Sequence, residues 1–218
     1  MKQLYFIFIA ILFLNISVAQ VYVNDMDYVL GDVKQGFITN AITTTNQVDN
    51  LIKGFKTMKV NGIRIPIYAD GVNPNVEMYD YFYNRAVEAG FEIFANPAQF
   101  IGGQRIACGI LNGTPCTVLN NNARTIALIN RIKEFAAQYP CKWINPLNED
   151  GAPGATWSAD QMTEIYKSLY KNLNGAELIG SGAWGIPASI TVMNRTDIHN
   201  YISVATCLLY TSPSPRDS

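Results

Sequence analysis

Histidine and closely paired cysteines are scarce in this sequence. His199 is the only histidine among 218 residues, and none of the 4 cysteines belongs to a Cys-x-x-Cys pair. A zinc site needs three or four ligands, usually His or Cys at short and recognisable spacings. The sequence therefore predicts no metal site built on His or Cys, and no motif in it calls for a cofactor.

An excess of positive charge is also lacking, because 16 Lys and Arg stand against 17 Asp and Glu. Proteins that bind nucleic acid usually carry a basic stripe or a clearly basic domain, so we expect no nucleic-acid partner. Apolar residues are plentiful instead, at 49% of the chain. They suffice for a large core, and the length fits one domain.

The N-terminus has the order of a secretory signal peptide. Lys2 precedes an apolar run over 4–14, and small residues over 17–19 follow it. The alternative is a membrane anchor, but the run is shorter than the roughly 20 residues that a span needs. We expect residues 1–19 to be cleaved after Ala19, leaving a secreted or periplasmic protein without a membrane segment.

The C-terminal residues 207–218 do not continue the patterns before them. They resemble the translated adapter of a transposase-based sequencing library, and a natural Ser/Pro-rich tail is the alternative. We expect native sequence to stop near Thr206, which makes 20–206 a partial domain and 207–218 an artefact.

Without Cys207, which belongs to the segment 207–218, three cysteines remain. Cys108 and Cys116 bracket a glycine-containing loop, and an exported compartment permits disulfides. The sequence leaves open whether the two pair. Cys141 begins a predicted strand and is expected to be a buried thiol.

Short apolar runs alternate with longer segments of helical period, which is typical of parallel βα units. Ser158 with Gln161 forms a capping box at the start of one of these helices. The predicted strands are 35–40, 62–67, 91–95, 142–148, 177–181 and 202–206. The predicted helices are 75–89, 123–139 and 158–173, with one more that starts near 45 and another that starts near 188.

Two architectures accept this pattern, an open doubly wound sheet and a closed barrel. The sequence has no Gly-x-Gly-x-x-Gly and no Gly-Lys-Ser/Thr phosphate loop, and this favours an α/β fold that is an incomplete TIM (β/α)8 barrel with strands 1–6. In a barrel, polar residues at the carboxyl ends of strands line the active site. Here those positions are Asn40, Arg64 to Tyr68, Asn96, Asn148 with Glu149, and Ser181 to Trp184.

Two of these strand ends carry a family resemblance. Gly62-Ile-Arg-Ile-Pro66 resembles the second strand of clan A glycoside hydrolases of families 5 and 30, and Pro146-Leu-Asn-Glu149 resembles their fourth. The order and spacing of the units agree over about residues 36–206. The resemblance implies an exported enzyme that cleaves β-glycosidic bonds of a polysaccharide or oligosaccharide by a retaining double displacement, with no cofactor and as a monomer.

The resemblance also implies residue roles. Glu149 matches the catalytic acid/base, Asn148 the residue that binds the sugar 2-hydroxyl, and Arg64 the residue that supports the nucleophile. One departure is Asp150, where many relatives have proline. The family's nucleophile comes from the end of strand seven, after the six strands predicted here, so we expect this chain alone to be inactive.

Other carboxylates do not fit the nucleophile. A retaining enzyme needs its second carboxylate ~5 Å from the first. Glu92 lies inside a strand, and we interpret Asp70 and Asp150 as loop or substrate contacts.

The substrate-binding candidates are Trp184, Tyr68, Asn96 and Asn40. For the aromatic residues, including Phe100 and Trp157, ordinary packing is an equal alternative. A second hypothesis for the whole chain is a non-catalytic carbohydrate-binding barrel, which the residue at the end of strand seven would distinguish from the enzyme. The sequence names neither the glycan nor the mode of attack, endo or exo.

Overall fold

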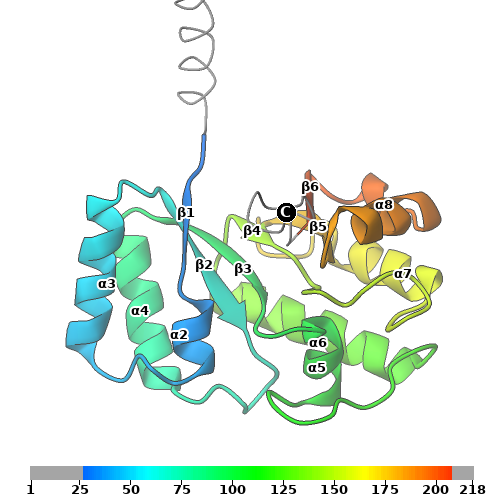
Figure 1. Cartoon of the computed structure of the whole chain (residues 1–218), viewed down its shortest axis with the longest axis horizontal. Coiled ribbons are helices and arrows are strands. Elements are labelled where there is room, and N and C mark those ends of the chain that lie inside the picture. Colours follow the sequence, from blue (N-terminus) through cyan, green and yellow to red (C-terminus); the bar gives the residue numbers. More distant parts are fainter. Residues whose placement is uncertain (1–26, 208–218) are drawn as a thin grey trace, which may run out of the picture.

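The computed structural model describes residues 27–207, so the predictions for positions 1–19 and 208–218 lie outside the described residues. Within this range six parallel strands form one sheet, in which each strand pairs with the next one along the chain (Figure 1). A doubly wound sheet reverses its strand order partway, whereas a barrel keeps the order of the sequence. The fold is therefore α/β and contains six strands of a TIM-type barrel, as predicted.

The strands are β1 (Leu30–Asp32), β2 (Gly62–Ile67), β3 (Glu92–Pro97), β4 (Trp143–Ile144), β5 (Glu177–Ala183) and β6 (Val204–Cys207). The helices are α2 (Lys34–Ile38), α3 (Thr45–Thr57), α4 (Val76–Glu88), α5 (Gly102–Cys108), α6 (Asn122–Gln138), α7 (Ala159–Leu169) and α8 (Ile186–Arg195), with a short 3-10 helix η1 (Ile198–Asn200). The predicted capping box of Ser158 and Gln161 is confirmed at the start of α7. No helix between residues 27 and 207 is long and apolar enough to cross a membrane.

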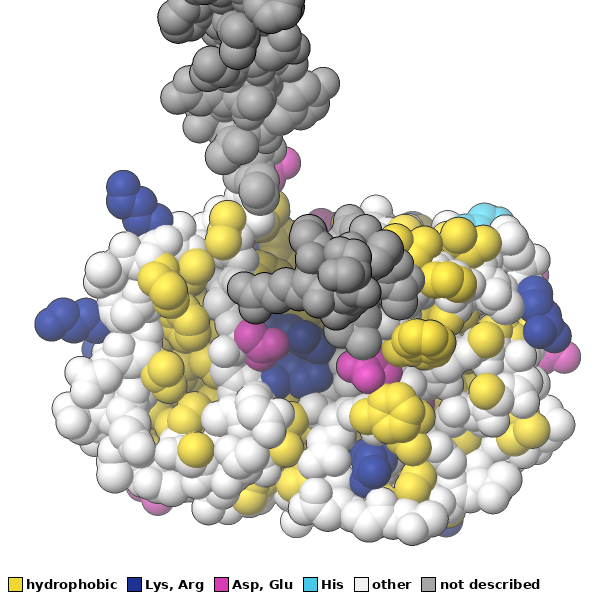
Figure 2. Space-filling view, viewed as in Figure 1, with side chains coloured by type: hydrophobic (Ala, Val, Ile, Leu, Met, Phe, Trp, Pro, Cys, Tyr) yellow, Lys and Arg dark blue, Asp and Glu magenta, His cyan; other side chains and the backbone are white. Residues whose placement is uncertain are grey.

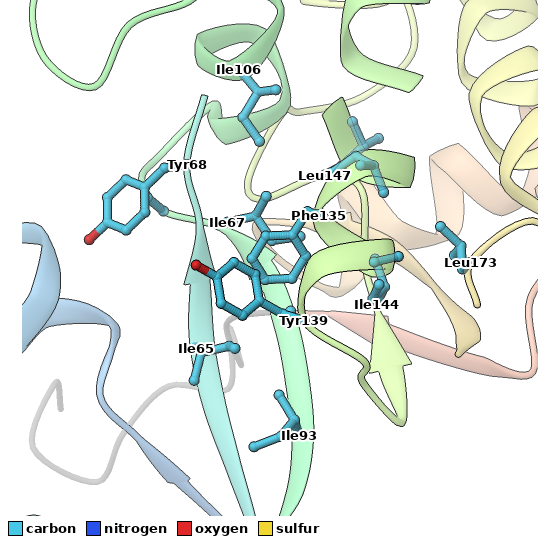
Figure 3. Packing of buried hydrophobic residues seen from close by; sticks show 14 of the residues in the cluster. Ile65, Ile67, Tyr68, Ile93, Ile106, Phe135, Tyr139, Ile144, Leu147 and Leu173 are labelled. Atoms are coloured by element: carbon cyan, nitrogen blue, oxygen red, sulfur yellow. The ribbon is translucent and has the colours of Figure 1, made fainter. Parts of the chain in front are cut away.

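The main core lies between the strands and the surrounding helices. Ile65 and Ile67 of β2 are buried there beside Phe135 and Tyr139 at the end of α6 (Figure 3). Because neighbouring side chains of a strand point to opposite faces, Arg64 is directed to the other side of the sheet. The alternation thus separates the packing residues from the candidate site residue.

The strand predicted at 35–40 is wrong. The first strand ends at Asp32, whose Oδ1 accepts a hydrogen bond from the Lys34 amide at 2.8 Å and turns the chain into α2. Phe37 is buried on the helix, where its ring packs against two rings of α4. Asn40 therefore does not lie at a strand end. It is exposed after α2, in a left-handed conformation with φ of 51°.

The fourth strand and the loop before it also differ from the prediction. Only two residues of the predicted strand 142–148 stay in the ladder. Helix α5 was not predicted, because it begins with Gly102 and Gly103, which have low helix propensity. Its first turn is stabilised by the carboxylate of Asp150, which accepts hydrogen bonds from the Gly103 and Gln104 amides.

The pairing that the sequence left open is present in the structure. Cys108 and Cys116 form a disulfide that closes the loop after α5. Cys141 is a free, half-buried thiol that donates to the Tyr139 carbonyl, and burial raises its pKa to about 12.

Candidate functional site

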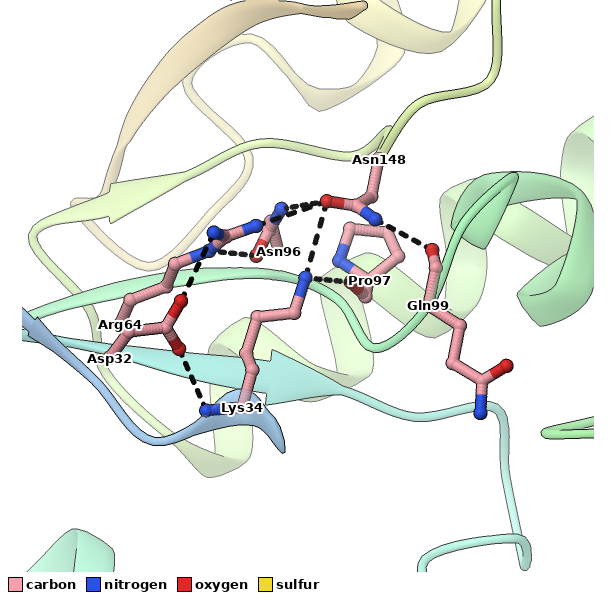
Figure 4. A network of polar contacts seen from close by, with 7 residues as sticks. All are labelled: Asp32, Lys34, Arg64, Asn96, Pro97, Gln99 and Asn148. Atoms are coloured by element: carbon pink, nitrogen blue, oxygen red, sulfur yellow. Dashed lines mark hydrogen bonds and ion pairs between the residues drawn. The ribbon is translucent and has the colours of Figure 1, made fainter. Parts of the chain in front are cut away.

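The carboxyl ends of the first four strands bring polar side chains into one cluster. Asp32 ends β1, Arg64 lies in β2, Asn96 in β3, and Asn148 follows β4 (Figure 4). The structure thus brings together three of the predicted site residues, namely Arg64, Asn96 and Asn148. It also adds Asp32 and Lys34, which the sequence reasoning did not select.

Asn148 is the centre of the cluster and is buried. Its Oδ1 accepts hydrogen bonds from Asn96 Nδ2 (2.7 Å), Arg64 Nη2 (3.1 Å) and Lys34 Nζ (3.2 Å). Its Nδ2 donates to the Gln99 carbonyl at 2.7 Å. An amide nitrogen carries two hydrogens, and within residues 27–207 only one of them has an acceptor, so the other is available to a ligand while the side chain is held in one orientation.

Arg64 uses the forked shape of its guanidinium to join three strands. Nε donates to Asn96 Oδ1 at 3.0 Å, and Nη1 pairs with Asp32 Oδ2 at 3.2 Å. With the bond to Asn148, the group has acceptors from β1, from β3 and from the segment after β4. This arrangement fixes the relative positions of the strand ends, which suits the planar and always charged Arg side chain.

Lys34 is the more deeply buried of the two cluster residues that the sequence reasoning did not select. Its Nζ donates to the Pro97 carbonyl at 2.8 Å as well as to Asn148. Burial and the neighbouring Arg64 cation lower the pKa of Lys34 to about 7, although Asp32 and Glu149 oppose the shift. The misplaced first strand hid this residue, since Lys is rarely buried and nothing local marks the position.

Glu149 lines a cavity of about 470 Å³ beside this cluster. Its φ of 60° is a left-handed conformation that non-glycine residues seldom adopt and that concentrates at functional sites. Its amide donates to the Gly182 carbonyl at 2.7 Å, which ties it to β5. Among residues 27–207, no hydrogen bond or ion pair engages the Glu149 carboxylate. The other residues that line the cavity are Asp32, Lys34, Gln35, Ile38, Arg64, Ala98, Gln99, Phe100 and Asn148.

The charges on this face alternate in sign. Figure 2 shows basic side chains in a hollow with acidic side chains on either side of them. The basic residues that line the cavity are Lys34 and Arg64, and the acidic residues that line it are Asp32 and Glu149. An acid and a compensating set of cations therefore face the same solvent-accessible space.

Asp150 is interpreted from the sequence as a loop or substrate contact, and the structure has it as a contact within the loop. The side chain is buried and bonds to the backbone of its own segment and of α5. Its carboxylate accepts from the amides of Asn148 (2.8 Å), Gln104 (2.9 Å) and Gly103 (3.0 Å) and from Trp157 Nε1 (3.1 Å). Burial raises the pKa of Asp150, and these hydrogen bonds oppose the rise. Asp150 thus fixes the backbone next to Glu149.

The aromatic candidates differ in whether they line this cavity. Tyr68 is buried, and its ring packs edge-on against Tyr79 of α4 at 6.0 Å between centroids. Trp184 follows β5 and is 45% exposed, but it is not among the residues that line the cavity. Phe100 is 58% exposed and does line it. An aromatic contact with a ligand is therefore better placed at Phe100 than at Tyr68.

The residues that the structure describes contain no group of three or more His, Cys, Asp or Glu able to hold a metal ion. The polar cluster holds cations and amides around one amide oxygen, which is an arrangement of hydrogen-bond donors. Its chemistry is suited to hydroxyl groups and to a developing negative charge.

No protein-family model and no curated protein matches the chain. Among solved structures, it is similar to a family 39 glycoside hydrolase from the gut symbiont Bacteroides cellulosilyticus WH2, with 16% identity and a TM-score of 0.54. That likeness covers 79% of this chain and 37% of the other. It shows a shared fold, that of a (β/α) barrel.

Weaker likenesses carry no separate argument. A β-glucuronidase from Parabacteroides merdae is 13% identical with a TM-score of 0.41, over 63% of this chain and 16% of the other. β-Glucuronidase 3 from Bacteroides uniformis is 14% identical with the same TM-score and the same shares of the two chains. The chain spans less than half the length of each of these three proteins.

Proposed function

We propose that this chain belongs to an exported, monomeric glycoside hydrolase that cleaves β-glycosidic bonds by a retaining mechanism, with Glu149 as acid/base. The observation that carries the proposal is the carboxylate of Glu149, which faces a cavity and has no hydrogen bond within residues 27–207, between two neighbours that are fixed by hydrogen bonds. The barrel shared with the family 39 glycoside hydrolase supports it. Assignment to family 5 or 30, and secretion after removal of 1–19, are part of the proposal.

The proposed chemistry has two steps. Protonated Glu149 donates its proton to the leaving oxygen while a second carboxylate attacks the anomeric carbon and forms a glycosyl–enzyme ester. The Glu149 carboxylate then removes a proton from water, which attacks the same carbon and releases the sugar. Asn148 directs its available N–H toward the sugar 2-hydroxyl. The second carboxylate is proposed to come from a strand that follows β6 in the complete gene product.

The direct test is Glu149→Ala in the complete gene product. We expect kcat for an aryl β-glycoside to fall about 10²- to 10⁴-fold, which is the usual contribution of a positioned acid/base. Sodium azide should restore part of the rate, because a small anion can occupy the vacated space and attack the intermediate. Glu134→Ala, on the exposed side of α6, is the matched control. Unchanged turnover in Glu149→Ala would remove this residue from the mechanism.

A second candidate function is carbohydrate binding without hydrolysis. Within residues 27–207, Asp32 is the only other acid that lines the cavity, and it is paired with Arg64. If the strand after β6 provides no carboxylate, the barrel would bind a glycan and leave it intact. Isothermal titration with oligosaccharides, beside an assay for reducing ends, separates the two functions.

A further inference from the structure

The proposed chemistry leaves one buried charge of the site without a role. Lys34 is 7% exposed, and its ammonium lies among the ends of four strands. A buried ammonium is costly unless its hydrogens are bonded. Two of its hydrogens have acceptors, the Pro97 carbonyl and Asn148 Oδ1. The fold thus keeps a desolvated amino group at this position and fixes it by hydrogen bonds.

The backbone holds Lys34 in place as well. Its amide donates to Asp32 Oδ1, so the turn that ends β1 also aims the side chain at the cluster. Figure 4 shows Lys34 reaching Asn148 from α2, whereas Arg64 and Asn96 reach it from their strands. The donors therefore approach the same oxygen from two directions.

This arrangement selects one orientation of the Asn148 amide. If the amide turned over, its NH2 group would face three donors and the Gln99 carbonyl would lose its hydrogen bond. Unpaired buried donors cost far more than a hydrogen bond gains. The more donors surround the oxygen, the more strictly the free N–H is directed.

We infer that Lys34 is a positioning residue of the proposed glycosidase, which fixes the Asn148 amide together with Arg64 so that its free N–H meets the substrate's hydroxyl group. The inference rests on the proposed function and adds to it. Lys34 acts through Asn148 and is not assigned to the reacting atoms.

The ionisation of Lys34 provides an independent readout. With a pKa lowered to about 7 by burial, the ammonium loses its proton as the pH rises through neutrality. The charged groups that face it are Asp32 at the end of β1, Arg64 in β2 and Glu149 after β4. From β3 and the segment after it, only the uncharged groups of Asn96, Pro97 and Gln99 face the cluster.

The test compares Lys34→Met and Lys34→Arg with Lys142→Met, a lysine at the other end of the sheet, in the complete gene product. Because a small misplacement of a binding group costs up to about 10²-fold, we expect Lys34→Met to lower kcat about 10- to 100-fold and to change KM less than about threefold. Lys34→Arg should recover part of kcat relative to Lys34→Met. Because Arg keeps its charge, the limb of the wild-type pH–rate profile near neutrality should shift in Lys34→Arg. Wild-type kcat and pH profile in both variants would overturn the inference.

A second measurement covers the case in which Lys34→Met does not fold. In protein labelled with 15N-asparagine, the side-chain amide signals of Asn148 should shift between pH 6 and pH 8.5 as Lys34 titrates, and should not do so in Lys34→Arg. Signals that are constant in the wild type would overturn the inference. If Glu149→Ala keeps full activity, the proposed function fails, yet this titration still decides whether the Lys34 ammonium lies against the Asn148 amide.

Discussion

Two lysines at opposite ends of the sheet have opposite environments. Lys34, at the carboxyl ends of the strands, is buried, and its pKa is lowered to about 7. Lys142 lies at the amino ends, where it pairs with Glu92 at 3.1 Å and sits 5.0 Å from the ring of Tyr28. Hydrogen bonds to Tyr28 and Glu92 raise the pKa of Lys142.

The difference shows that charged groups are solvated differently at the two ends of the strands. At the amino ends, the charges of Lys142 and Glu92 stay partly in contact with water. At the carboxyl ends, several polar groups are desolvated together, which costs stability and marks functional sites. If this division is correct, substitutions at the carboxyl ends should have larger effects than their counterparts at the amino ends.

The largest effect is expected for Asp150→Ala. The substitution leaves four N–H donors without their acceptor, three of them on the backbone, so we expect the free energy of unfolding to fall by about 4 kcal/mol. Urea denaturation of the complete gene product measures it. Glu92→Ala, which removes the acid at the amino ends, is the control. An equal effect of both substitutions would break the comparison.

Loss of the disulfide should come next. Cys108 and Cys116 close a short loop with a sequence separation of 8, for which loop entropy predicts a loss of about 2 to 3 kcal/mol in Cys108→Ser with Cys116→Ser. Cys141→Ser, at the free thiol, controls for the loss of a sulfur atom. The expectation fails if the double variant unfolds at the same urea concentration as Cys141→Ser.

The pH dependence of stability should change in Lys34→Met. Folded protein releases the Lys34 proton near pH 7, while in the unfolded chain the lysine has its ordinary pKa of about 10.5. The unfolded state then binds more protons, so stability rises with pH in this window, by about 1 to 2 kcal/mol between pH 7 and pH 8.5. Cys141 and Tyr83, whose pKa values are raised, lower stability only at more alkaline pH.

Urea midpoints at pH 7 and pH 8.5 measure this rise. It should be present in the wild type and absent in Lys34→Met. A variant with the wild-type slope would show that another group is responsible.

The smallest effect is expected for Lys142→Met. The Lys142–Glu92 ion pair is partly exposed, and such a pair contributes little and is screened by salt. We expect its urea midpoint to match the wild type in 0.5 M NaCl. A clear loss of stability under these conditions would show that the amino ends depend on charge as the carboxyl ends do.

Much of the fold follows from local sequence, because β2, β3 and β5 are apolar runs next to amphipathic helices. The first strand could not be found this way, since β1 is three residues long and Leu30 is exposed. Helix α5 was missed because its first turn depends on Asp150, 46 residues away from Gln104. Local patterns do not contain such contacts.

The site residues likewise fall into those that local sequence predicts and those that depend on distant contacts. Arg64, Asn148 and Glu149 stand in short motifs at strand ends, and their grouping was predicted. Lys34 gains its environment from Pro97 and Asn148, which are 63 and 114 residues away. Whether a lysine is solvated or buried is decided by those distant segments, so its own neighbours in the sequence gave no signal.

The amide oxygen of Asn148 has one more consequence. Its donors come from α2, β2 and β3, so it has its full set of partners only when these elements and the end of β4 have assembled. Slow hydrogen exchange of the Asn148 side chain should therefore report cooperative unfolding of the whole first half of the barrel. A protein that is only partly folded would lack an oriented Asn148, and ligand binding would select against it.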